Sequence, residues 1–179
     1  MGDGSDFWRF SLSFYGEEQV AEACLRLQDE AGADVNMLLF LLWRARQGRR
    51  LSAGEIAALD AAVSGWRAEV VVPLRSVRRW LKGHAGPVQP DEAEKLRREV
   101  KGIELEGERL QQAAMAALAE IAAPGKAAGS PDEAAMASLA AYEEFRGRAL
   151  PQGPVKVLLG SLARCDTASR LGAGGKGGV

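Results

Sequence analysis

A run of seven large apolar residues, MLLFLLW at positions 37–43, constrains the fold of this chain more than any other stretch. A helix built from this run has no polar face, because its apolar side chains point in every direction. Such a helix belongs at the centre of a bundle, where other helices surround it. The run is too short to cross a bilayer, which needs about 20 apolar residues. We therefore predict a buried central helix over about residues 34–47.

The rest of the chain carries helix signals and few β-branched residues. Val20, Cys24, Leu27 and Ala31 recur at spacings of four and three, which places them on one packed face of a helix. We expect the helices outside the centre at about residues 6–15, 17–31, 52–72, 74–82, 91–122, 131–148 and 155–167, with Pro73 kinking or restarting the chain between the third and the fourth. The sequence predicts an all-α fold, a single bundle of six to seven helices around the central one.

The helix expected over residues 91–122 is the longest. Its apolar and small residues alternate spacings of four and three: Leu96, Val100, Ile103, Gly107, Leu110, Ala114, Ala117 and Ile121. An average spacing of 3.5 is typical of the seam between paired helices. We therefore expect this row to face a neighbouring helix, and Gly107 to allow a close approach.

Length and composition indicate one domain. With 179 residues and 47% hydrophobic content, the chain can bury a single core. We expect one helical domain over residues 1–168 and a disordered, glycine-rich tail over residues 169–179, with a flexible break at residues 124–131. The polar, acidic start lacks the pattern of an export signal, so we expect a cytoplasmic protein with reduced thiols.

Four blocks of the sequence resemble a known family: FWRFSLSFY at 7–15, ACLRLQDEAGADVNMLLFLLW at 23–43, PLRSVRRWLK at 73–82 and KGIELEGERLQ at 101–111. Over about residues 6–120 the chain is similar to the bacterial domain-of-unknown-function family 2390. The block around residues 33–43 is its most specific part, and no similarity is seen from residue 124 onward. The resemblance implies a helical fold and supports the boundaries expected above, but it implies no activity.

The first candidate site lies at the start of the central helix. Asp34 and Asn36 are polar residues at the mouth of an otherwise apolar segment. The preferred interpretation is that Asp34 caps the helix and Asn36 bonds a neighbouring segment. The alternative is a polar end wall of a ligand pocket between helices. That pocket would be bounded by Trp8, Asp34, Asn36, Trp43 and Arg78.

The second candidate is a basic stripe, defined as Arg75, Arg78, Arg79 and Lys82. Residues 44–84 contain nine basic and three acidic residues, although the whole chain has a net charge of −1. The stripe could bind an anionic membrane surface, a phosphate-bearing ligand or RNA. The preferred interpretation is internal pairing, because the helix over residues 91–122 is rich in glutamate.

Catalytic signals are weak. His84, the only histidine, lies in a glycine- and proline-rich loop without a partner for a catalytic dyad. Glu104, Glu106 and Glu108 alternate along a helix and are expected to spread around it. Two cysteines and one histidine provide no metal framework, so we expect no metal, no cofactor and no catalytic residue.

These observations leave three hypotheses for function. The preferred one is a non-enzymatic interaction or adaptor protein with an unknown protein partner. The second is a small-ligand-binding protein or enzyme, with an interhelical pocket that could take an anionic small molecule. Anionic-surface or RNA binding through residues 75–82 is the third, and nucleic acid is the least favoured partner. A homo-oligomer is compatible with each of them.

Overall fold

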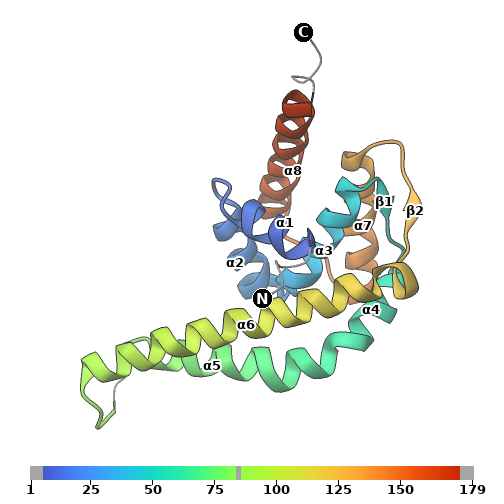
Figure 1. Ribbon diagram of the computed structural model, residues 1–179. Coiled ribbons are helices and arrows are strands. Elements are labelled where there is room, and N and C mark those ends of the chain that lie inside the picture. Colours follow the sequence, from blue (N-terminus) through green and yellow to red (C-terminus); the bar gives the residue numbers. More distant parts are fainter. Residues whose placement is uncertain (1–5, 84–85, 174–179) are drawn as a thin grey trace.

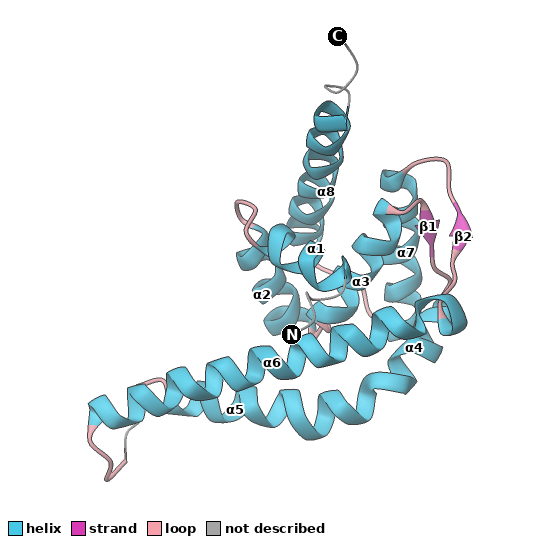
Figure 2. Cartoon of the chain, viewed as in Figure 1, coloured by secondary structure: helices cyan, strands magenta, loops and turns pink. Residues whose placement is uncertain are grey.

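The computed structural model describes residues 6–83 and 86–173, with side chains described up to residue 165. This part of the chain is helical except for loops and two short strands (Figure 2). The elements are α1 (Asp6–Tyr15), α2 (Val20–Ala31), α3 (Val35–Arg46), β1 (Arg49–Arg50), α4 (Ala53–Trp66), η1 (Arg67–Val71), α5 (Val72–Leu81), α6 (Pro90–Ala122), β2 (Lys126–Ala127), α7 (Pro131–Arg146) and α8 (Gln152–Ala173). Because α4, η1 and α5 form one unbroken helix, the described residues hold seven helices, and the predicted all-α bundle is confirmed.

Helix α3 lies at the centre of the bundle, as predicted. It packs against α1, α2, α6, α7 and α8 (Figure 1). Every residue from 37 to 42 is buried, and Phe40, Leu41 and Leu42 are fully enclosed. Asp34 caps the helix by accepting a hydrogen bond from the Asn36 amide at 2.9 Å. Helix α3, which has no polar face, is thus surrounded by other helices.

The chain passes from α4 to α5 through a π-helical turn, η1, and not through a break. Pro73 has no amide hydrogen, so the carbonyl of Glu69 has no α-helical donor. One extra residue is accommodated here, and the amide of Val72 donates to the carbonyl of Arg67, five residues earlier. The wider turn directs Val71 against α6, where it meets Gly107. Gly107 does allow the expected close approach, and its neighbour there is η1.

The seam predicted along α6 is wrong in phase. Leu96, Ile103, Leu110 and Ile121 are exposed, and of the eight predicted residues only Val100 and Gly107 are buried. The buried residues of α6 instead include three polar ones: Glu104, Gln111 and Gln112. Burial on α6 follows the neighbours α1, α3 and α5, which supply partners for polar groups. Apolar spacing alone therefore did not identify the packed face.

Residues 124–131 also differ from the prediction of a flexible break. Part of this segment, β2, pairs antiparallel with β1, so that Arg50 lies opposite Lys126. Gly125 has a φ of +69°, and a Cβ there would lie 3.0 Å from the carbonyl oxygen of Arg50. The glycine is needed for both reasons.

Helix α8 runs to Ala173, past the expected end at residue 167. Residues 169–173, the first five of the predicted tail, thus belong to α8. Residues 174–179 lie outside the described residues, so a disordered tail there stays a prediction.

The central position of α3 predicts a large loss of stability when its core is truncated. Leu42→Ala removes a fully buried side chain and leaves a cavity, so the free energy of unfolding should fall by about 2–5 kcal/mol. Denaturant unfolding followed by circular dichroism measures this. Met136→Ala, at an exposed site on α7, is the control and should unfold like the wild type. Equal midpoints for both variants would contradict the central role of α3.

Candidate functional site

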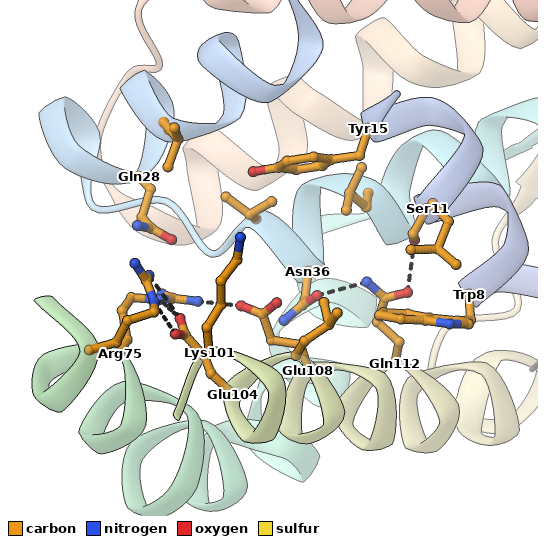
Figure 3. A pocket seen from close by; sticks show the side chains of 16 residues that line it. Trp8, Ser11, Tyr15, Gln28, Asn36, Arg75, Lys101, Glu104, Glu108 and Gln112 are labelled. Carbon is orange, nitrogen blue, oxygen red and sulfur yellow. Dashed lines mark hydrogen bonds and ion pairs between the residues drawn. The ribbon is translucent and has the colours of Figure 1, made fainter. Parts of the chain in front are cut away.

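A cavity of about 390 Å³ lies between α1, α2 and the start of α3 on one side and α5 and α6 on the other (Figure 3). Its size is within the range of small-molecule sites. The α1–α3 side is mainly apolar and includes Trp8, Leu12, Tyr15, Leu25, Val35 and Leu39. The opposite side is mainly charged and includes Arg75, Arg78, Lys101, Glu104 and Glu108. We call these the apolar wall and the charged floor.

The charged floor is built around Glu104, which is only 5% exposed. It accepts a hydrogen bond from Nε of Arg75 at 3.1 Å and one from Nη2 of Arg78 at 3.2 Å, and Nε of Arg78 forms a further ion pair with it. Arg75 also donates to Glu108 at 2.6 Å. The predicted internal pairing of the basic stripe with the acidic helix is confirmed for Arg75 and Arg78.

The two glutamates of the floor respond differently to burial. Burial alone would raise the pKa of Glu104, but hydrogen bonds from Arg78 and Arg75 offset this and lower the pKa below its ordinary value. Glu108 shares only Arg75, and burial raises its pKa in spite of that arginine. Glu104 is thus held as a carboxylate, whereas Glu108 is the less satisfied anion of the pair.

A buried polar chain closes one end of the cavity. The hydroxyl of Ser11 donates to Oε1 of Gln112 at 2.8 Å, and Nε2 of Gln112 donates to Oδ1 of Asn36 at 2.8 Å. This chain links α1, α6 and α3 (Figure 3). Asn36 was expected to bond a neighbouring segment, and its partner is on α6, 76 residues away. Within the described part of the chain, the side-chain nitrogen of Asn36, Nδ2, donates to no other residue.

Lys101 and Tyr15 face each other across the cavity. The side chain of Lys101 rises from α6 towards the apolar wall (Figure 3). Lys101 is exposed and makes no ion pair within the part of the chain that the structure describes. Burial, with smaller contributions from Cys24 and Glu108, raises the pKa of Tyr15 to about 12, so its hydroxyl remains a neutral donor.

A second cavity of about 330 Å³ adjoins the first and shares Asn36 and Arg75 with it. Here Arg67 bridges Oδ2 of Asp34 and Oδ1 of Asp60, each at 2.7 Å. The hydroxyl of Tyr142 accepts a hydrogen bond from the Asp34 amide at 3.0 Å. Arg67 is therefore paired inside this cavity, and the capping interpretation of Asp34 is confirmed. Arg146, which also lines the cavity, donates to the carbonyl of Ala31, and its buried Nη1 has no partner among the described residues.

The predicted pocket residues do not all meet. Trp8, Asn36, Arg75 and Arg78 line the first cavity, whereas Asp34 lines only the second. Trp43 stacks on Phe7 at 5.2 Å between ring centroids and lines a separate hollow.

The other candidates lie elsewhere. Arg79 forms an ion pair with Asp29 of α2 at 2.7 Å and not with α6. His84 lies outside the described residues. Whether any of the predicted residues binds a ligand stays a prediction.

Sequence reasoning missed Lys101, Gln112 and the convergence of Glu104 with Glu108. The expectation that the glutamates of this segment spread around the helix is wrong for these two. Residues four apart lie on the same helix face. That spacing was the signal available, and it points Glu104 and Glu108 at Arg75 together.

Comparison with known proteins identifies a family and no closer relative. Residues 6–115, more than half of the chain, match the family described as a protein of unknown function (DUF2390). The chain belongs to this family. No curated protein and no solved structure shows significant similarity to it. The matched residues include the whole lining of the first cavity.

Two further findings bear on the kind of site. Among the described residues, none of the helices has the length and apolar character needed to span a membrane. The same part of the chain holds no cluster of three or more histidine, cysteine, aspartate or glutamate side chains placed to bind a metal ion.

The charged floor predicts a pH-dependent contribution to stability. Glu104→Gln removes a buried carboxylate from the half-buried Arg75 and Arg78, so the free energy of unfolding should fall by about 1.5–3 kcal/mol at pH 7. Because folding lowers the pKa of Glu104, its contribution is present above the ordinary value of 4.5 and is lost as the pH falls through the folded-state pKa. The difference between wild type and variant should therefore shrink in acid.

Urea unfolding at several pH values measures this difference. Glu106→Gln is the matched control, since Glu106 is an exposed carboxylate on the same helix that pairs only locally with Arg109. It should unfold like the wild type. A loss for Glu104→Gln that is independent of pH would contradict the role of its charge.

Proposed function

We propose that this protein binds a small amphipathic anion in the first cavity and that it acts as a binding protein without catalysis. The observation that carries this proposal is the ammonium group of Lys101, which reaches over an apolar wall without an ionic partner in the described chain. A carboxylate or a similar anion attached to an apolar body would satisfy both surfaces. The hydroxyl of Tyr15 and the amide nitrogen of Asn36 supply further donors to such a head group.

The charge balance of the cavity supports an anionic ligand. Three cations, Arg75, Arg78 and Lys101, face two carboxylates, Glu104 and Glu108, which leaves one positive charge in excess. The two arginines are already engaged by the glutamates. The excess charge is therefore located on Lys101. A monoanion would neutralise the site without breaking an existing ion pair.

The apolar wall favours a ligand whose body, apart from the anionic head group, is apolar. Leu12 and Leu25 of this wall, and Leu105 on the α6 side, line the cavity and are about half exposed. Burial of apolar surface contributes about 25 cal/mol per Å², so covering these side chains favours binding. A ligand with an acyl or aromatic body fits this wall better than a sugar or a free amino acid.

A second candidate function is that of an interaction or adaptor protein. It is supported by exposed apolar side chains on α5 and α6, including Trp80 and Ile103, away from the cavity. Binding of RNA or a membrane through the basic stripe has less support. Arg75 and Arg78 already pair with glutamates of α6, and Arg79 pairs with Asp29.

The proposal predicts that Lys101 determines anion binding. The test probe is 8-anilinonaphthalene-1-sulfonate, an aromatic anion whose fluorescence rises in apolar surroundings. Lys101→Glu changes the excess charge of the cavity from +1 to −1, so the affinity for the probe should fall about tenfold or more, which corresponds to about 1.4 kcal/mol. The melting temperature should not change, because Lys101 is exposed.

Lys95→Glu is the matched control, with the same charge change on an exposed residue of α6 outside the cavity. It should bind the probe like the wild type. Equal loss in both variants would show that only the overall charge matters. No loss in either would overturn the proposal. Native mass spectrometry of the purified wild type would show whether a small molecule stays bound.

A further inference from the structure

Helices α5 and α6 expose a second apolar surface. Six large side chains that are 41–60% exposed make up this surface, which we call the outer face: Trp66, Val77, Trp80, Leu96, Ile103 and Leu110. They come from the end of α4, from α5 and from the first two thirds of α6. Isolated apolar residues are common on protein surfaces, but a continuous group of this size marks an interaction site.

Helix geometry places these residues on one side. Leu96, Ile103 and Leu110 are seven residues apart and form a line along α6. Val77 follows Arg75 by two residues, so it points away from the charged floor that Arg75 helps to form. Trp66 reaches α6 directly, since its Nε1 donates to the carbonyl of Gly107 at 3.0 Å. The outer face therefore lies on the side of the α5–α6 pair opposite the cavity.

The apolar side chains of the outer face are not covered by a second layer of helices in the described chain. Helix α5 and the first half of α6 extend beyond the other helices as an arm two helices thick (Figure 1). Little is buried between them in this part, and the buried apolar residues there are Leu81, Ala93 and Val100. Helices bury an apolar stripe by packing into a layered core. On the outer face no described element of the chain provides that layer.

We propose that the outer face is covered by the outer face of a second copy of this chain, so that two helix pairs form a four-helix layer about a twofold axis. The seven-residue spacing along α6 suits helix–helix packing of this kind. In a dimer with twofold symmetry, the same patch of both copies forms the interface. This pairing does not depend on ligand binding in the cavity.

The size of the face fits a stable dimer. A whole aromatic side chain buries about 150–250 Å², so the six half-exposed side chains present on the order of 500 Å² of apolar surface. A standard interface buries about 800 Å² per partner, of which somewhat more than half is apolar. The outer face therefore supplies the apolar area that one partner of such a dimer needs.

The charge of the face favours a copy of itself as the partner. All six side chains are uncharged. Glu99 and Glu106, four residues before and three residues after Ile103, border the line on α6, and Glu106 is paired with Arg109. The charged groups of the arm that carry buried ion pairs, Arg75, Arg78 and Glu104, belong to the cavity side. A strongly charged partner would find no group of opposite charge among these six side chains.

Light scattering coupled to size-exclusion chromatography tests the proposal on the full chain. At about 1–100 µM, a range that detects micromolar affinity, the wild type should approach twice the 19.1 kDa mass of one chain. The double variant Trp80→Glu/Ile103→Glu should stay monomeric with unchanged helicity, because both sites are exposed. Its melting temperature should not depend on protein concentration, whereas that of the dimeric wild type should rise with concentration. Met136→Glu, at an exposed apolar site on α7, should dimerise like the wild type.

A cross-linking measurement locates the contact. Ile103 is the middle residue of the line along α6, so in an antiparallel helix pair the two copies of residue 103 lie face to face. Ile103→Cys in a Cys165→Ser background, with oxidised glutathione as oxidant, should give a disulfide-linked dimer, whereas Met136→Cys should not. Cys24 can remain, because it is buried and desolvation raises the pKa of its thiol to about 12.

Three results would overturn the proposal. They are a wild type that is monomeric across the whole concentration range, a dimer that survives Trp80→Glu/Ile103→Glu, and equal cross-linking through residues 103 and 136. A monomer that binds vesicles or another protein through the outer face would assign the face to a different partner. A loss of probe binding in Lys101→Glu leaves the dimer unaffected, so the two proposals fail separately.

Discussion

The structure depends on enclosing α3, a helix without a polar face. Every side of this helix must be covered, and α1, α2, α6, α7 and α8 provide the cover. The cover is incomplete at both ends of the helix: Arg46 is exposed at the C-terminal end, and Asp34 and Val35 are half-buried at the N-terminal end. Both cavities open beside that end. The constraint that fixes the core thus also decides where a ligand site can form.

Helix α6 connects the core, the cavity and the outer face. Towards α1 and α3 it presents buried polar groups such as Gln112, which receive partners from both helices. Towards α5 it presents Glu104 and Gly107, one for ion pairs and one for a close approach. Its apolar line, with Ile103 at the middle, is left to solvent. Helix α6 therefore takes part in both of the proposed binding surfaces.

The two proposals use different physical terms. The cavity would select its ligand by the excess charge on Lys101 and by apolar area together, so binding should weaken with charge reversal and with salt. The outer face would bind by apolar area alone and should resist salt. The residues that match the DUF2390 family include the cavity lining and both helices of the arm.

Local sequence determined the helices of this protein. The apolar run at residues 37–43 and Pro73 each act within a few residues, and the structure has a central helix and a π-helical turn at those places. Only the tertiary structure decided which face of α6 is buried. Ion pairs such as Arg75–Glu104 join residues 29 positions apart and make a polar face the stable one to bury. Spacing along one helix cannot reveal partners that come from others. For that reason the position of Lys101 in the cavity and the exposed outer face could not be predicted.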